Sequence, residues 1–123
     1  MAIRVLYIGI EPSLIDPAML PPGMTTEILA QGIQDVLHKL ESSGFVADWC
    51  SIDLGETAEA TVAMALESQP VDCVVIGAGI RTGTPYFLLF EKVLNVVHLR
   101  APKSKICFNT KPDDTVEAVQ RWS

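Results

Sequence analysis

The sequence predicts a single α/β domain, residues 1–123, built on a four-stranded parallel sheet with helices on both faces. Three observations predict it. Four short apolar runs alternate along the chain with four segments of helical periodicity. The runs are rich in Val, Ile, Cys and Phe, as strands covered on both faces should be. The length of 123 residues suits one domain with its own core.

The four apolar runs are the expected strands. Only the second run alternates polar with apolar residues, so it is the predicted edge strand. Strand–helix alternation with right-handed crossovers favours the strand order 2-1-3-4, a flavodoxin-like or Rossmann-like arrangement with one strand fewer than usual. The expected strands cover residues 3–10, 46–52, 73–78 and 105–109.

Helical spacing of apolar residues predicts the first helix at residues 26–43. Its apolar stripe begins at Ile28. Thr25 or Thr26 can cap its start, and Gly44 suits the left-handed conformation just past its end.

The other three helices are bounded by capping and proline signals. The second is expected at about residues 58–68, with Thr57 as a cap. The third is expected at about residues 85–100, with Thr84 as its cap and a proline at its first position. The fourth is expected at about residues 113–122, with two aspartates at its positive end.

One connection is longer than a parallel α/β domain needs. Residues 11–24 read EPSLIDPAMLPPGM and include four prolines, whereas such connections usually have about 2–6 residues. The segment follows the first strand, so it lies above the carboxyl edge of the sheet, where ligands bind in open α/β folds. It is either a surface loop stiffened by proline, or a lid or partner-binding loop.

The carboxyl ends of all the strands point to one edge of the sheet. The crevice should open there between the first and third strands, where the strand order reverses. Glycines end both of these strands, and glycine lets a ligand or another backbone approach closely. The candidate ligand-binding residues at this edge are Gly9, Glu11, Asp53, Gly77, Gly79, Arg81, Thr82, Asn109 and Thr110.

The segment VVIGAGIRTGTPY, residues 74–86, raises the question of a phosphate cradle. Gly77, Gly79 and Gly83 form G-x-G-x-x-x-G, which is one residue longer than the dinucleotide fingerprint and follows the third strand rather than the first. The position about 20 residues further on is not acidic, as the fingerprint requires. A dinucleotide site is therefore disfavoured.

A weaker interpretation keeps this loop as an anion site. The loop leads into a helix N-terminus, whose free N–H groups favour an anion, and Arg81 could add a forked contact. Thr82 and Thr84 would add hydroxyl groups. The alternative is that the glycines serve only the turn and that Arg81 is solvated. Pairing of Arg81 with Asp53 or Glu11 is the main rival explanation.

Other site chemistries find less support. The chain has no H-E-x-x-H or similar metal pair, and its three cysteines match no zinc pattern, so we expect no metal site and three buried thiols. Glu11 and Asp53 could act as catalytic carboxylates if burial or proximity shifted their pKa values. The sequence assigns no reaction, no catalytic residue and no cofactor.

The composition restricts the partners and the compartment. The formal net charge is −6 and the nine basic residues are scattered, which disfavours nucleic acid and anionic membranes. No apolar run approaches the roughly 20 residues that span a bilayer, and the N-terminal run is too short for a signal peptide. We therefore expect a cytoplasmic protein, a setting that also suits an odd number of buried thiols.

The helix expected at residues 85–100 is more apolar than the others. Its apolar residues cover about half of the circumference, which is wider than the stripe a helix needs on a sheet. The excess predicts either cover by residues 11–24 or a homodimer interface, and the homodimer is the leading expectation. The residues concerned are Tyr86, Phe87, Leu89, Phe90, Val93, Leu94, Val96 and Val97.

Three segments, DCVVIGAGIRT, LFEKVLNVVH and KICFNTKPDDTVEAVQRW, resemble a family of small uncharacterised bacterial proteins with a Rossmann-like domain. The resemblance covers roughly the second half of the chain. It implies the fold and a bacterial, cytoplasmic setting, and it brings with it no assigned activity and no catalytic residue. It suggests testing five residues together: Arg81, Glu91, Asn95, His98 and Asn109.

Two functions remain open at this point. The first is binding of a small anionic, phosphate-bearing ligand at the carboxyl edge, with or without an enzymatic role. The second is a non-catalytic interaction protein that acts as a homo-oligomer. Convergence of Arg81, Asp53, Glu11 and Asn109 on one pocket would favour the first function. A filled or apolar edge would favour the second.

Overall fold

The computed structural model describes residues 2–82 and 84–123, and it confirms the predicted fold class. Four parallel strands form one sheet in the order β2-β1-β3-β4, so β2 and β4 are the edges. On one side of β1, Arg4 pairs with Val46, and on the other side Val5 pairs with Cys73. The strands are β1 (Arg4–Ile10), β2 (Val46–Ile52), β3 (Cys73–Ile76) and β4 (Lys105–Phe108).

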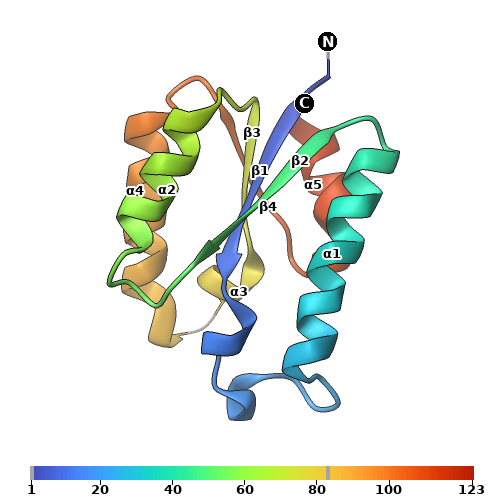
Figure 1. Ribbon diagram of the computed structural model, residues 1–123, viewed down its shortest axis with the longest axis vertical. Coiled ribbons are helices and arrows are strands. Elements are labelled where there is room, and N and C mark those ends of the chain that lie inside the picture. The colour runs from blue at the N-terminus through green and yellow to red at the C-terminus, as the bar shows by residue number, and fades with distance from the viewer. Residues whose placement is uncertain (1, 83) are drawn as a thin grey trace.

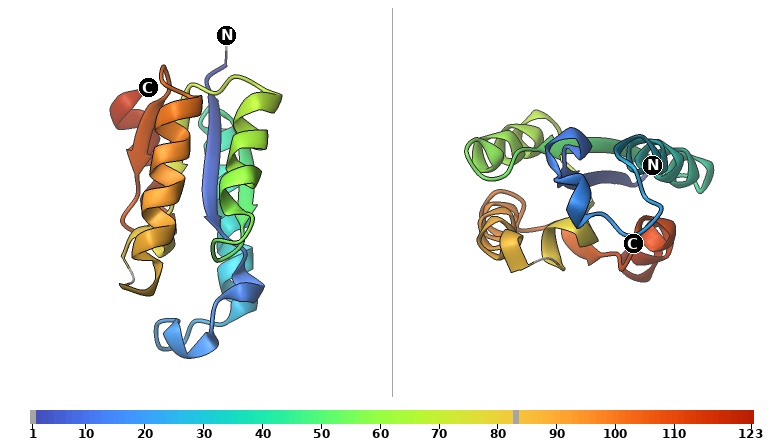
Figure 2. Two further views of the ribbon diagram at one scale, coloured as in Figure 1. Left: turned by 90° about the vertical axis from the view of Figure 1, so that its left-hand side faces the viewer. Right: turned by 90° about the horizontal axis from the view of Figure 1, so that it is seen from below.

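Alternating side chains give the sheet two buried faces. Even-numbered strand residues such as Ile8 and Ile52 pack against α2 and α4. Odd-numbered residues such as Val5 and Val75 pack against α1 and α5. Figures 1 and 2 show these two helix pairs on opposite sides of the sheet. The helices are α1 (Thr26–Ser42), α2 (Ala58–Ser68), α4 (Phe87–Arg100) and α5 (Thr115–Trp122).

The first helix confirms its predicted capping. The Thr25 hydroxyl accepts a hydrogen bond from the N–H of Ile28 at 3.1 Å, and Gly44 has a φ of 94°. The prediction that the Ile28 side chain joins the apolar stripe is wrong, because that side chain is 51% exposed. Only the later turns of α1 lie over the sheet, and there Val36 and Leu40 are buried.

The predicted glycine loop after β3 is a short helix instead. Only Gly77 separates the end of β3 at Ile76 from the start of α3 (Ala78–Arg81), so β3 stops earlier than expected. A 3₁₀ turn (Thr84–Tyr86) then leads into α4, which begins at Phe87 rather than at residue 85. The fixed φ of proline suits this 3₁₀ turn as well as a helix start. Gly83 and the side chain of Thr84, our predicted cap, lie outside the described part of the chain.

The last helix is also preceded by a 3₁₀ turn. Pro112–Asp114 forms that turn, and α5 begins at Thr115 instead of residue 113. The carboxylate of Asp114 accepts hydrogen bonds from the N–H groups of Thr110 and Lys111, at 2.9 and 3.3 Å. These bonds close the turn at the end of β4, so the aspartate serves the connection rather than the first turn of the helix.

Residues 11–24, which we call the Pro-rich loop, are ordered by two single 3₁₀ turns, Pro12–Leu14 and Pro17–Met19. In each turn the carboxylate just before the proline accepts a hydrogen bond from a backbone N–H two residues on, as Asp16 does from Ala18 at 2.9 Å. The loop projects past the carboxyl edge of the sheet, between the end of β1 and the start of α1 (Figure 1).

Candidate functional site

A cavity of about 320 Å³ opens at the carboxyl edge, beside the ends of β1 and β3. We call it the carboxyl-edge cavity. It occupies the crevice position that the strand order predicts. Its walls come from the strand ends, the Pro-rich loop, the first half of α1 and the segment after β4. Apolar side chains make up most of these walls, among them Ile15, Leu20, Met24, Leu29, Ile33 and Tyr86.

The charged part of the cavity wall is small. Among the described residues, Lys111 is the one charged side chain that lines the cavity, and no carboxylate lines it. The whole chain, in contrast, carries 15 acidic and nine basic residues. A wall with a lysine and no carboxylate favours a neutral or anionic ligand over a cation.

Buried hydrogen bonds cross beneath the cavity. Asn109 is 1% exposed, and its Oδ1 accepts from the N–H of Ala78 at 2.8 Å. Its Nδ2 donates to the Thr115 hydroxyl at 2.9 Å and to the Tyr7 hydroxyl at 3.4 Å. Burial raises the pKa of Tyr7, and the bonds to Asn109 and Thr115 oppose that rise. Asn109 therefore joins β1, α3 and α5 at one point.

Two of the predicted glycines stand in close contact with neighbouring groups of the protein. A Cβ on Gly9 would lie 2.5 Å from Cη2 of Trp49, whose ring packs edge-to-face on Tyr7 with centroids 5.1 Å apart. A Cβ on Gly77 would lie 3.2 Å from the carbonyl oxygen of Ile8. At Gly79 nothing stands within 4 Å. Close approach is thus used by the protein itself at Gly9 and Gly77, and Gly79 alone of the three faces open space.

Arg81 does not line the cavity. Its Nε donates to the carbonyl oxygen of Ile76 at 3.1 Å, and its Nη2 donates to the carbonyl oxygen of Asn109. The guanidinium also stacks over the Phe108 ring, 4.8 Å from the centroid. The side chain therefore ties the carboxyl ends of β3 and β4 together. It is not simply solvated, and the rival pairing with Asp53 or Glu11 does not occur.

The two rim carboxylates each close a connection. Glu11 Oε2 accepts a hydrogen bond from the Ser51 hydroxyl at 2.8 Å, which joins the Pro-rich loop to β2. Asp53 accepts from the Thr57 hydroxyl at 2.6 Å and from the N–H of Gly55 at 3.0 Å, in the turn that leads into α2. These bonds, the one from Thr57 first, lower the pKa of Asp53. The two carboxylates do not form a pair.

The carboxyl-edge cavity brings together part of the predicted set. Glu11, Asp53 and Arg81 do not line it, so the convergence that would have favoured a phosphate-bearing ligand does not occur. The mostly apolar wall is instead the outcome expected of an interaction protein. The predicted ligand-binding set left out Lys111, although this residue follows the fourth strand at the same edge, and it left out the apolar side chains of the Pro-rich loop. The signal was present, because that loop carries Ile15, Leu20 and Met24. The predicted residues that line the cavity are Gly9, Gly77, Gly79, Thr82, Asn109 and Thr110.

The segment after β3 offers little to a phosphate. The N–H of Ala78 donates to Asn109, the N–H of Ile80 to the carbonyl of Gly77 at 3.1 Å, and the N–H of Thr82 to the carbonyl of Ala78 at 2.9 Å. A phosphate cradle needs such N–H groups to be free. The glycine segment is therefore better explained as the entry to α3 than as a cradle.

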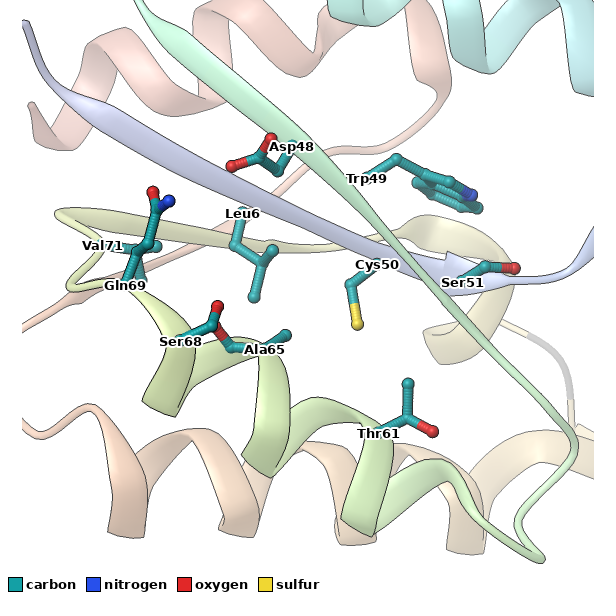
Figure 3. A pocket seen from close by; sticks show the side chains of 10 residues that line it. All are labelled: Leu6, Asp48, Trp49, Cys50, Ser51, Thr61, Ala65, Ser68, Gln69 and Val71. Carbon is teal, nitrogen blue, oxygen red and sulfur yellow. The ribbon is translucent and has the colours of Figure 1, made fainter.

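A second hollow, of about 430 Å³, lies at the opposite side of β1, between β2 and α2. We call it the β2 groove. Figure 3 shows Cys50 pointing from β2 toward α2 and Trp49 pointing to the other side of the strand. Burial raises the pKa of the Cys50 thiol to about 11, so the thiol is protonated at neutral pH. The side chains around the groove include Leu6, Cys50, Thr61, Ala65 and Ser68.

Neither a cluster of metal ligands nor a membrane-spanning helix is present in the part of the chain that the structure describes. No group of three or more His, Cys, Asp or Glu there could hold a metal ion. None of the described helices combines the length and the apolar character needed to cross a bilayer.

No protein-family model and no curated protein sequence matches the chain. The resemblance to a bacterial Rossmann-like family therefore stays a prediction. Function has to be argued from the carboxyl-edge cavity and from the surfaces around it.

Proposed function

We propose that the protein binds a small anionic molecule with an apolar body in the carboxyl-edge cavity. One observation carries this proposal: Lys111 is the one charged side chain on the described wall, in a chain of net charge −6, and most of the remaining wall is apolar. The volume of about 320 Å³ lies at the low end of ligand pockets, which span about 300–1,000 Å³. The ligand is accordingly small.

The wall suggests how such a ligand would lie. Its anionic group would meet Lys111, which follows β4, while its apolar body would lie against Leu29 and Ile33 of α1. Arg81 takes no part, because its guanidinium already donates to two backbone carbonyls. A lysine holds an anion as a flexible point charge, which suits a carboxylate or a phosphate equally.

The Pro-rich loop acts as the lid of this cavity. Leu20, Pro21 and Met24 contribute to the wall, and the sulfur of Met19 accepts a hydrogen bond from the Tyr86 hydroxyl at 3.8 Å. This contact joins the loop to the turn before α4, across the mouth of the cavity. It favours the lid interpretation of the loop over that of a bare surface connection.

An NMR titration of isotope-labelled protein tests the proposal with two probes. One is 1-anilinonaphthalene-8-sulfonate, which carries apolar rings and a single negative charge, and the other is inorganic phosphate. We expect the sulfonate to shift the amide signals of Gly79, Leu29 and Thr110. Lys111→Met should weaken its binding about tenfold, which corresponds to about 1.4 kcal/mol.

Lys103→Met is the matched control, because Lys103 is exposed at the opposite edge of the sheet and should leave binding unchanged. Phosphate alone should bind weakly, since it lacks an apolar body. Shifts confined to other surfaces, or equal binding by Lys111→Met and wild type, would contradict the proposal.

A second candidate function is self-association through the helix at residues 85–100. It is favoured by Phe87 and Leu88, which are 65% and 62% exposed in the first turn of α4. The rest of the apolar arc is already engaged, because Leu89 and Val93 are buried against the sheet. The exposed part is therefore narrower than the sequence predicts.

A further inference from the structure

The outer edge of β2 presents a regular row of backbone groups. The N–H of Val46 donates to the carbonyl of Ile3, and the carbonyl of Ile52 accepts from the N–H of Glu11, both at 2.9 Å. In a parallel pair, alternate residues face the same neighbour. The even-numbered residues of β2 therefore face β1. The groups that face outward are the N–H and C=O of Ala47, Trp49 and Ser51.

The other edge of the sheet is protected against pairing. β4 has four residues and begins with Lys105. The carbonyl of Phe108, which faces outward in the same alternation, accepts a hydrogen bond from Nη2 of Arg121 at 3.0 Å. A short strand, a lysine and a covered carbonyl are devices by which natural proteins prevent association at a strand edge.

None of these devices protects β2. The strand has seven residues, VADWCSI, without lysine or proline. Its single charge, on Asp48, is balanced by Arg4 of the same chain at 3.6 Å. Among the described residues, no backbone group of a loop or turn bonds the outward N–H and C=O groups of β2. The edge is thus long, nearly neutral and open.

The β2 groove runs beside this open edge. Small side chains of α2, Thr61, Ala65 and Ser68, line it, and Figure 3 shows them along the side of the helix that faces the strand. Met64, one turn before Ser68, is 70% exposed. Small side chains allow a second helix to approach closely, and an exposed methionine supplies an adaptable apolar contact.

We propose that the protein forms a homodimer in which two β2 strands pair in antiparallel fashion about a two-fold axis at Trp49. The two-fold axis beside Trp49 relates each outward group of one strand to the same group of its copy. Trp49 would exchange both backbone hydrogen bonds with Trp49 of the second copy, and Ala47 would pair with Ser51. The result is a continuous eight-stranded sheet.

A second copy fits this edge better than an unrelated strand for one structural reason. The axis lies perpendicular to the sheet, so α2 of both copies would lie on the same face and meet across the β2 groove. The contact is isologous, as in most soluble dimers. Trp49 also lines the carboxyl-edge cavity, but the pairing uses its backbone groups, and the other residues of the contact neither line that cavity nor lie in α4. This proposal and the proposed function can therefore fail independently.

Light scattering coupled to size-exclusion chromatography gives the first test. Wild type should have the mass of a dimer at high concentration. Ala65→Arg places a bulky charge on the α2 face next to its symmetry copy, and it should yield a folded monomer with unchanged circular dichroism. Phe87→Arg, on the exposed first turn of α4, is the matched control and should remain a dimer.

Amide hydrogen exchange resolved by NMR gives the second test, and it does not depend on the fold of any variant. The Trp49 amide should exchange slowly at high concentration and quickly on dilution, whereas the Cys50 amide, bonded to β1, should be slow throughout. A monomeric wild type at all concentrations would overturn the proposal. A dimer that is dissociated by Phe87→Arg and not by Ala65→Arg would also overturn it. The same holds if the exchange rate of the Trp49 amide does not depend on protein concentration.

Discussion

The carboxyl edge of the sheet has two halves, and in each half the role predicted from the sequence differs from the role seen in the structure. The half at the ends of β3 and β4 holds Arg81 and Asn109, residue types that suggest a ligand. Yet the Asn109 amide bonds three groups of the protein, and Arg81 donates to two backbone carbonyls. The half under the Pro-rich loop looks in the sequence like a simple connection between a strand and a helix. In the structure, apolar side chains of this loop form part of the cavity wall. Charged and polar residues at a strand end thus need hydrogen-bond partners, and other groups of the same protein can be those partners.

We expect the largest loss of stability from a substitution in the polar half of the carboxyl edge, at Asn109. Asn109→Ala leaves the buried N–H of Ala78 and the hydroxyl of Thr115 without their shared partner. We expect a loss of about 2–4 kcal/mol in the free energy of unfolding. Urea unfolding measures it.

Asn95→Ala is the matched control, because Asn95 is exposed on α4 and its amide bonds only the carbonyl of Glu91. It should change stability by less than about 0.5 kcal/mol. Equal effects of the two substitutions would show that Asn109 does not organise the edge.

Packing at the β1 end of the cavity is the next test. Gly9→Ala places a Cβ 2.5 Å from the Trp49 ring, so we expect a loss of about 1–3 kcal/mol from overpacking. Gly79→Ala meets open space inside α3 and should leave stability unchanged or raise it by up to about 1 kcal/mol. Adding Trp49→Phe to Gly9→Ala should recover part of the loss, and thermal unfolding of the set would show whether it does.

The smallest of the three losses of stability is expected for Arg81→Ala. It tests whether Arg81 stabilises the strand ends or binds an anion. Arg81→Ala should lower the free energy of unfolding by about 1–2 kcal/mol without any anion present, because two backbone carbonyls lose a charged donor. Arg100→Ala breaks only an exposed ion pair with Glu67 and should cost less than about 1 kcal/mol.

Phosphate sharpens the same measurement. If Arg81 serves the strand ends alone, phosphate should raise the melting temperature of wild type and of Arg81→Ala by the same general salt effect. A rise seen only in wild type would assign Arg81 to a ligand after all.

Much of the fold could be predicted because its signals are local and periodic. Parallel strands covered on both faces read as apolar runs, and the glycine at position 44 marks the end of α1 by its φ of 94°. The exposure of Ile28 could not be read in the same way. Helical spacing shows which side a residue faces, and it does not show that the first turns of α1 project past the sheet.

The candidate site was predictable in position and not in composition. The strand order places a crevice between β1 and β3, and the cavity lies there. The role of Gly9 depends on Trp49, which is 40 residues away in the sequence, and no local pattern reports that contact. Similarly, the partners of Arg81 are main-chain carbonyls, which every residue has and no sequence motif records.

The Pro-rich loop has a consequence for how this protein can change. Each of its two turns is held by a proline and by a carboxylate directly before it, so most of its shape is encoded within the loop. Few contacts of the loop hold the sheet together, whereas several of its side chains form the wall of the carboxyl-edge cavity. Replacing this segment as a unit would therefore change the wall of the carboxyl-edge cavity, and with it any ligand that the cavity is proposed to bind, while the sheet and its helices stay the same.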